Sequence, residues 1–278
     1  MSSSIIFPGQ GSQHIGMGEN FIMEYPHEIE KANEILEFDI IEMILKNPEN
    51  KLNHTLYTQP LIYVVSCLSY LEYLKNNSKP YFVCGHSLGE YTALFAAEVF
   101  DFETGLRIVK KRAQLMDENK DGSMLAVMGE SINEIDKILK MKEIKDVYVA
   151  NNNSNEQVIL SGIKENLELA SQILSNYEYK CVPLPVSGAF HSPLMENARK
   201  EFQNFLAKFT FNPPTLQMIS STNAQLIDLR YILETLSFQL VRGVQWVKTI
   251  LNMKEYGVRD FIEVGPGNVL TKLLPKIL

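Results

Sequence analysis

A serine between two glycines most constrains this chain, in the pentapeptide Gly85-His86-Ser87-Leu88-Gly89. The apolar run 81–84 before it is typical of a buried strand, and residues 90–99 after it are typical of a helix. Glycines on either side of a strand-to-helix turn let neighbouring backbone pass without a Cβ clash, so the serine hydroxyl is exposed. A G-x-S-x-G pattern also occurs by chance, but this flanking context favours an α/β fold with Ser87 as a nucleophile.

The order of predicted elements divides the chain into two parts. Between residues 123 and 186 the pattern predicts a strand at 124–128, a helix at 132–139, strands at 146–150 and 157–161, a helix at 164–175 and a strand at 179–184. This β-α-β-β-α-β order is the ferredoxin-like arrangement. We therefore expect a small ferredoxin-like subdomain, residues 123–186, inserted into a large α/β-hydrolase-like subdomain formed by 1–122 and 187–278.

The large part is predicted to be mainly helical around a few strands. Strands are expected at 5–7, 81–84 and 260–264, and the helical segment 19–46 is expected to break near Pro26. Pro60 is placed at the start of a helix, because proline is tolerated in the first turn. After His191 the pattern is helical until the strand at 260–264.

Composition excludes several classes of function. The 278 residues carry a formal net charge of −7, which disfavours nonspecific nucleic-acid binding because that requires dense positive charge. The most apolar stretch, residues 61–71, is too short to span a bilayer, which needs roughly 20 residues. The three scattered cysteines show neither a metal-binding spacing nor a disulfide framework, so we expect a reducing cytoplasm.

A serine at its ordinary pKa needs a general base, and His191 is the best candidate of the five histidines. It lies in a predicted loop between a strand and a helix, downstream of the serine, as in hydrolase-like enzymes; a surface-loop histidine is the alternative. His86 adjoins the serine, so it either lines the pocket or is structural. No carboxylate is a compelling third member: Asp146 lies in the small subdomain, but a backbone or amide oxygen also orients an imidazole.

Arg112 lies late on a predicted helix, in the segment 110–116. Basic residues are common near helix C-termini, so a solvated helix face is one interpretation. The other is a guanidinium fork that binds a carboxylate group of a ligand.

These motifs together resemble those of the malonyl-CoA:acyl-carrier-protein transacylase family, which includes acyltransferases of fatty-acid and polyketide synthesis. The similar segments extend over nearly the whole chain in the family's order. They are 7–13 (FPGQGSQ), 58–60 (TQP), 85–90 (GHSLGE), 112–116 (RAQLM), 150–157 (AN-NS--Q), 188–192 (GAFHS), 239–246 (QL---VQW) and 263–267 (EVGPG).

The resemblance implies a role for each matching residue. Ser87 would attack the malonyl thioester, and His191 would take its proton and later activate the thiol of the carrier protein. The amides of Gln10 and Leu88 would form the oxyanion hole, and the backbone carbonyl of Gln239 would hold the imidazole. Arg112 would bind the malonyl carboxylate. Further substrate contacts would come from Phe190, Met116 and His86. No bound cofactor or metal is implied: malonyl-CoA is a substrate and phosphopantetheine belongs to the acyl carrier protein.

Some features depart from the family pattern. Ala113 replaces a usual glycine, Gly243 a common proline and Asn155-Glu156 a Pro-Gly pair. None removes a catalytic group. The bulky Phe190 resembles malonyl-selecting members, because a smaller residue there goes with methylmalonyl. Two other functions stay open at this stage: an acyl hydrolase that clears stalled carrier proteins, and a non-catalytic docking subunit.

Overall fold

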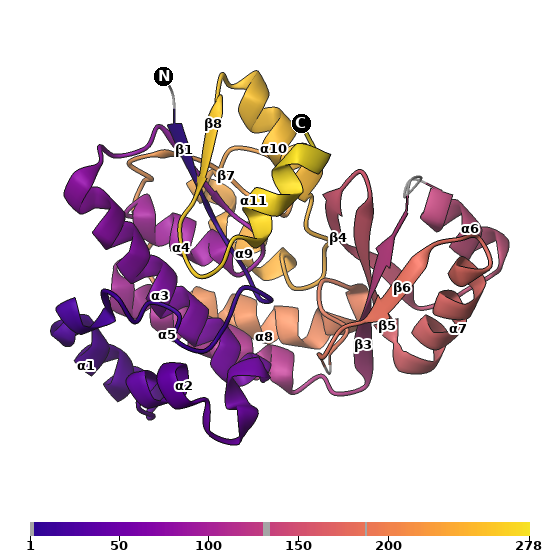
Figure 1. The fold of residues 1–278 in the computed structure, drawn as a ribbon, viewed down its shortest axis with the longest axis horizontal. Helices are drawn as coiled ribbons and strands as arrows, with labels where there is room; N and C mark the ends of the chain where they lie inside the picture. The colour runs from indigo at the N-terminus through magenta and orange to yellow at the C-terminus, as the bar shows by residue number, and fades with distance from the viewer. Residues whose placement is uncertain (1–2, 130–133, 187) are drawn as a thin grey trace.

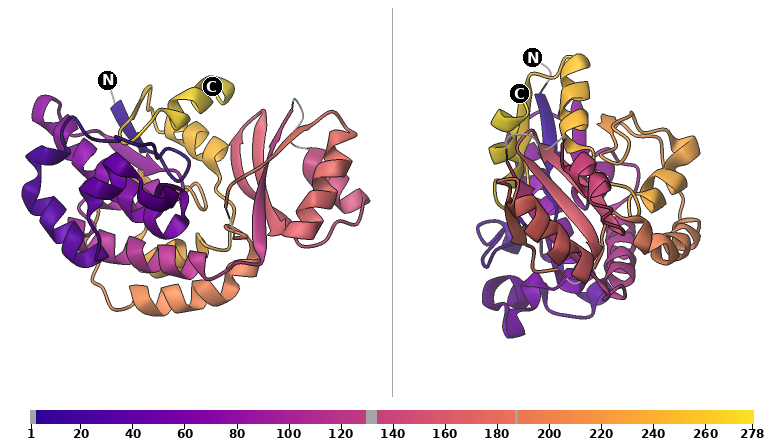
Figure 2. Two further views of the ribbon diagram at one scale, coloured as in Figure 1. Left: turned by 60° about the horizontal axis from the view of Figure 1, so that its bottom comes forward. Right: turned by 90° about the vertical axis from the view of Figure 1, so that its right-hand side faces the viewer.

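Two four-stranded sheets organise the chain in the computed structural model, which describes residues 3–129, 134–186 and 188–278 (Figure 1). One sheet is parallel and lies among helices, and the other is antiparallel and forms the small subdomain. The α/β fold with a ferredoxin-like insertion is therefore confirmed. The left view of Figure 2 shows that the small subdomain stands to one side of the large one.

The large sheet has the strand order β7-β2-β1-β8, with all neighbours parallel. Its strands are β1 (Ser3–Phe7), β2 (Phe82–Gly85), β7 (Gln217–Ile219) and β8 (Asp260–Glu263). The central strands β1 and β2 are buried except at Ser3, as expected for a parallel sheet covered by helices on both faces. The sequence missed β7, because three residues are too few to establish a period.

Helices surround this sheet. They are α1 (Pro26–Leu36), α2 (Ile40–Lys46), α3 (Thr55–Asn76), α4 (Gly89–Ala96), α5 (Phe102–Asp117), α8 (Glu196–Leu206), α9 (Ile232–Phe238), α10 (Trp246–Glu255) and α11 (Val269–Leu273). Short 3-10 helices occupy Ile22–Glu24, Pro48–Asn53, Pro193–Met195, Leu229–Tyr231 and Leu274–Lys276.

Two helix boundaries differ from the sequence prediction. Pro60 lies inside α3, not at its start, because the chain already turns helical at Thr55; the tertiary packing of this almost wholly buried helix outweighs one lost backbone hydrogen bond. The segment 19–46 breaks a second time after Leu36. There Glu37 takes a left-handed conformation, and the Asp39 side chain accepts from the Glu42 amide to begin α2.

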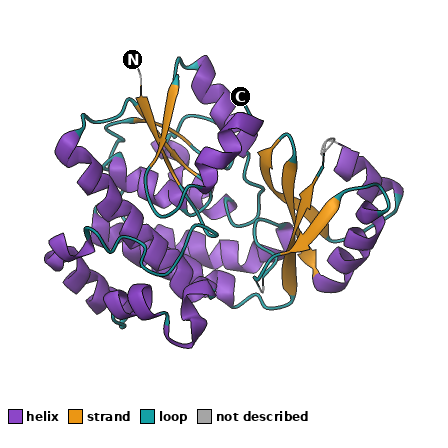
Figure 3. Cartoon of the chain, in the orientation of Figure 1, coloured by secondary structure: helices purple, strands orange, loops and turns teal. Residues whose placement is uncertain are grey.

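The small sheet has the order β4-β5-β3-β6, with all pairs antiparallel. Its strands are β3 (Gly122–Met128), β4 (Val147–Ser154), β5 (Gln157–Ile163) and β6 (Lys180–Pro183). Helices α6 (Ile135–Met141) and α7 (Lys164–Ser175) cover the face turned away from the large subdomain, and they enclose a separate apolar core (Figure 3).

Two predicted boundaries, Ile132 at the start of a helix and residue 187 at the return to the large subdomain, lie outside the described residues. We keep as a proposal that 123–186 is the small subdomain and that 1–122 with 187–278 forms the large one. Within the described ranges, no helix is long and apolar enough to cross a membrane.

The two subdomains are joined by backbone pairing. The amide of Asn152 donates to the carbonyl of Val244 (2.9 Å), and the amide of Val244 donates to the carbonyl of Ala150 (2.8 Å). An ion pair between Lys276 and Glu156 (2.7 Å) adds a contact near the C-terminus. Strand β4 therefore reaches from the small sheet to the edge of the large subdomain.

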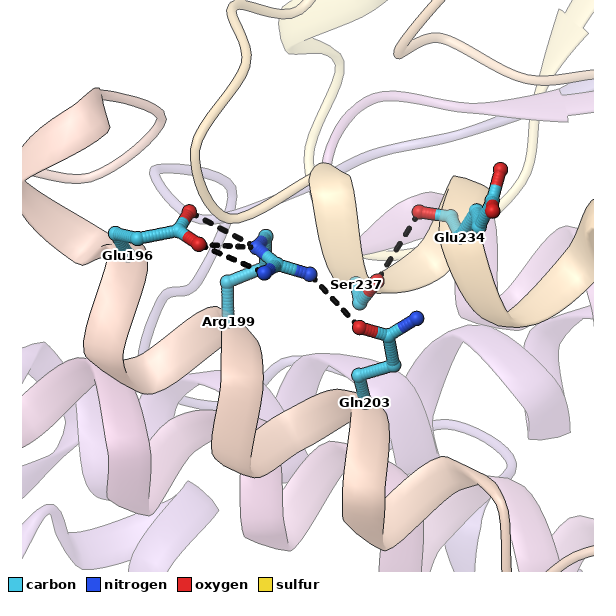
Figure 4. A network of polar contacts seen from close by, with 5 residues as sticks. All are labelled: Glu196, Arg199, Gln203, Glu234 and Ser237. Atoms are coloured by element: carbon cyan, nitrogen blue, oxygen red, sulfur yellow. Dashed lines mark hydrogen bonds and ion pairs between the residues drawn. The ribbon is translucent and has the colours of Figure 1, made fainter.

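Helix α8 packs against α9, and Figure 4 shows polar contacts within each of these helices: those of Arg199 on α8 and the bond from the Ser237 hydroxyl to the Glu234 carbonyl on α9. The guanidinium of Arg199 forms a bidentate pair with Glu196, donates to Gln203 Oε1 (2.8 Å) and lies 4.7 Å from the ring centre of Phe238. Phe238 ends α9 immediately before Gln239, so this contact between the helices lies next to the backbone that reaches the site.

Candidate active site

Ser87 lies on a sharp turn between the end of β2 and the start of α4. Its φ of +51° is in the left-handed region, which is strained for a residue other than glycine. Both flanking glycines are required by close packing. A Cβ on Gly85 would lie 1.9 Å from the carbonyl carbon of Gly89, and one on Gly89 would lie 2.1 Å from the carbonyl oxygen of Phe7.

His191 lies against the serine hydroxyl. Its Nε2 is 2.8 Å from Ser87 Oγ, and its Nδ1 is 2.7 Å from the backbone oxygen of Gln239. Because a carbonyl only accepts, the imidazole proton resides on Nδ1 and leaves Nε2 free to accept from the serine. His191 is 5% exposed, which excludes a solvated surface histidine. Asp146, the carboxylate considered as a third member, instead accepts from the Tyr148 hydroxyl in the small subdomain.

Arg112 extends from α5 to the same hydroxyl. Its Nη2 donates to Ser87 Oγ (3.0 Å) and its Nε and Nη2 donate to Gln239 Oε1, while Nη1 donates to Gln59 Oε1. At 1% exposed, it is not part of a solvated helix face. Its hydrogen bonds within the described residues all go to uncharged groups. A buried guanidinium without a carboxylate partner is costly, so the site is suited to an anionic ligand.

Burial and the neighbouring cation set the charge state of the imidazole. Removal from water, followed by the positive charge of Arg112, lowers the pKa of His191 from 6.5 to about 3. The neutral ring therefore persists at neutral pH. Burial also lowers the pKa of Arg112 from its ordinary value.

A cavity of about 210 Å³ opens above Ser87. Its lining includes the backbone around Gln10, the elbow residue Leu88 and the apolar side chains of Met116 and Phe190. Within the described ranges, neither the Gln10 nor the Leu88 backbone amide donates to a protein acceptor. Both amides are thus available to a bound oxygen atom.

His86 lines the cavity and also connects the two subdomains, which resolves the alternatives that the sequence left open. Its Nε2 donates to Asn153 Oδ1 on β4 (2.8 Å), and its ring packs edge-on against Trp246 with 5.4 Å between ring centres. Burial lowers its pKa below 6.5. The residue next to the nucleophile is therefore a neutral link between the elbow and the small subdomain.

Comparison with known proteins decides the family. The model of the acyl transferase domain family matches residues 5–277. The chain belongs to the acyl transferase domain family. It is similar to the Bacillus subtilis polyketide biosynthesis malonyl CoA-acyl carrier protein transacylase PksC, with 44% identity over 98% of this chain and 96% of that protein.

Solved structures of malonyl transacylases are similar to this acyl transferase over its whole length. One is the malonyl CoA-acyl carrier protein transacylase from Burkholderia pseudomallei, with a TM-score of 0.96, 34% identity, and coverage of 100% of this chain and 98% of the other. Another is a malonyl-transacylase in complex with a type II polyketide synthase acyl-carrier protein, with a TM-score of 0.95, 32% identity, and coverage of 100% and 93%.

The acyl transferase site contains residues to which the sequence assigned no role. Gln59 and Asn153 were noted only as parts of motifs, yet one contacts Arg112 and the other His86. Glu90, in the GHSLGE motif, has a fully buried side chain. The sequence signal that could have pointed to Glu90 is a charged residue among the apolar residues of α4.

Proposed function

We propose that this chain transfers a malonyl group from malonyl-CoA to the phosphopantetheine thiol of an acyl carrier protein through a malonyl-Ser87 intermediate. One observation carries the proposal: Ser87 Oγ lies 2.8 Å from the base His191 and 3.0 Å from the buried cation Arg112. A nucleophile between a base and a carboxylate-binding fork suits an acyl group with a free carboxylate. The names of the similar proteins support the same substrate and partner.

In the proposed first half-reaction, Ser87 Oγ attacks the thioester carbonyl carbon while His191 Nε2 accepts the hydroxyl proton. The carbonyl oxygen becomes an oxyanion that the amides of Gln10 and Leu88 stabilise. The tetrahedral intermediate collapses, the carbon–sulfur bond breaks, and the imidazolium returns its proton to the departing CoA thiolate. The carbonyl of Gln239 holds the ring in the required tautomer throughout.

The second half-reaction is the reverse with a different thiol. His191 accepts the proton of the phosphopantetheine thiol, whose sulfur attacks the malonyl ester. The serine oxygen leaves and recovers the proton. These steps use only groups of the chain together with malonyl-CoA and the carrier protein's phosphopantetheine. The proposal also places the enzyme in the cytoplasm, as the scattered cysteines predict.

Selection of the acyl group is assigned to three side chains. Arg112 would form a bidentate ion pair with the malonyl carboxylate. An acetyl group has no carboxylate and could not form this pair. Phe190 and Met116 line the same cavity and would restrict the space beside the acyl α-carbon, which favours malonyl over branched groups. An acyl hydrolase is disfavoured, because clearing stalled neutral chains requires no carboxylate clamp.

Intact-protein mass spectrometry tests the proposal. After brief mixing with malonyl-CoA, the protein should gain the mass of one malonyl group, and Ser87→Ala should gain none. Acetyl-CoA at the same concentration should give a much smaller adduct. An adduct that persists in Ser87→Ala, or a preference for acetyl-CoA, would contradict the proposed function.

The lowered pKa of His191 predicts an unusual pH dependence. Because the folded-state pKa is about 3, the base stays neutral as the pH falls through 6.5, the ordinary histidine value. The kcat/KM for acylation reports the free enzyme and should be flat between about pH 5 and pH 8. Stopped-flow detection of released CoA measures it, and an acid limb with a midpoint near 6.5 would contradict a buried neutral base.

A further inference from the structure

Glu90 is a fully buried carboxylate that the proposed mechanism does not use. It lies on α4, three residues after the nucleophile, and its Oε2 accepts three hydrogen bonds. The donors are the Ser221 amide (3.1 Å), the Ser221 hydroxyl (2.9 Å) and Gln239 Nε2 (3.1 Å). Burial raises its pKa, and these donors oppose that shift by stabilising the anion.

The side-chain amide of Gln239 lies between this carboxylate and the Arg112 guanidinium. Its Oε1 accepts from Arg112 Nε (3.2 Å) and Nη2 (2.9 Å), and its Nε2 donates to Glu90 and to the backbone oxygen of Ser87 (3.1 Å). Turning the amide around would place its NH₂ against the guanidinium and its oxygen against the carboxylate. Both contacts would be repulsive, so Glu90 and Arg112 together allow one orientation.

We propose that Glu90 is a positioning residue for acyl selection: through the Gln239 amide it holds the Arg112 fork in the orientation that receives the acyl carboxylate. This inference rests on the proposed function. The geometry links Arg112 to the Glu90 carboxyl group through one uncharged amide, without a direct ion pair. A carboxylate in direct contact would pair with the guanidinium and compete with the acyl carboxylate, whereas the uncharged Gln239 oxygen at Nε and Nη2 leaves the guanidinium without a paired anion.

Substitutions at both ends of this connection test the inference. Glu90→Met and Gln239→Met each remove the polar atoms at nearly constant length, and the second keeps the backbone carbonyl that holds His191. Each should lower the ratio of malonyl-CoA to acetyl-CoA kcat/KM by about tenfold, mainly through the KM for malonyl-CoA. The double variant should lose no more than either single variant, because both interrupt one connection. Glu90→Gln keeps an acceptor oxygen and should leave the ratio unchanged within the error of the measurement.

Thr92→Val is the matched control. Thr92 lies on the same helix, is equally buried and lies beside the Cys67 thiol instead of Gln239, so the selectivity ratio should not change. If Glu90→Met does not fold, Glu90→Asp replaces it: a carboxylate one methylene short should lower the ratio by about threefold, and an unchanged ratio in this folded variant would refute the inference.

Two outcomes would overturn the role of Glu90. One is an equal loss of malonyl and acetyl transfer in Glu90→Met, and the other is a double-variant loss equal to the product of the two single losses. The wild-type protein separates this failure from that of the proposed function. If the wild-type protein forms no Ser87-linked malonyl adduct, the proposed function fails. If it forms the adduct and the variants give either of these two contradicting outcomes, only the inference about Glu90 fails.

Discussion

Replacing His191 with alanine is expected to slow acylation of Ser87 by about 10⁴-fold. The serine would lose the base 2.8 Å from its Oγ, and the second imidazole that lines the described cavity, His86, already donates from Nε2 to Asn153. Arg112 would remain in position, so the KM for malonyl-CoA should change little. Rapid-quench measurement of the acyl-enzyme at saturating malonyl-CoA gives the rate.

His27→Ala is the control for this substitution, because His27 is an exposed histidine that does not line the cavity above Ser87. It should acylate at the wild-type rate. A His191→Ala protein that keeps its thermal unfolding midpoint and still acylates within about tenfold of wild type would show that the imidazole is not the base.

Replacing Arg112 with alanine is expected to lower kcat/KM for malonyl-CoA by about 10²- to 10³-fold. The malonyl carboxylate would then enter a buried cavity without its charged partner, at a cost of about 2–4 kcal/mol. Acetyl-CoA has no carboxylate to lose, so its kcat/KM should fall far less. Competition between the two thioesters in one reaction, analysed by mass spectrometry of the acyl-enzyme, measures the ratio directly.

Arg107→Ala is the matched control for Arg112, because Arg107 lies on the same helix with 53% of its side chain exposed. It should leave the malonyl preference unchanged. Equal losses for malonyl-CoA and acetyl-CoA in Arg112→Ala would refute the clamp and leave the arginine a structural role.

The sequence predicts the strand-to-helix turn at Ser87 well, because the signal is local. A strand, a glycine-flanked serine and a helix are contiguous, and sterics at Gly85 and Gly89 determine the turn. The order of elements likewise predicts the small subdomain, since each strand and helix has its own period. The same reasoning places Ser87 correctly on a strand-to-helix turn without any tertiary information.

Other features depend on contacts between distant segments, so no local pattern reveals them. The Gln239 carbonyl reaches His191 from 48 positions away, and the Gln239 amide meets Glu90 from 149 positions away. The predicted strand ends at residue 150, yet β4 extends to Ser154 because these polar residues pair with β5, and Asn152 also pairs with the backbone of Val244. In each case the partner is supplied by the fold.

Discharge of the acyl-enzyme distinguishes a transferase from a hydrolase most directly. The protein is loaded with malonyl-CoA, freed of excess thioester and divided between buffer alone and buffer with a phosphopantetheine-bearing acyl carrier protein. We predict that the malonyl adduct persists in buffer and moves to the carrier-protein thiol when that partner is present. Loss of the adduct to water at the same rate in both samples would contradict a malonyl transferase.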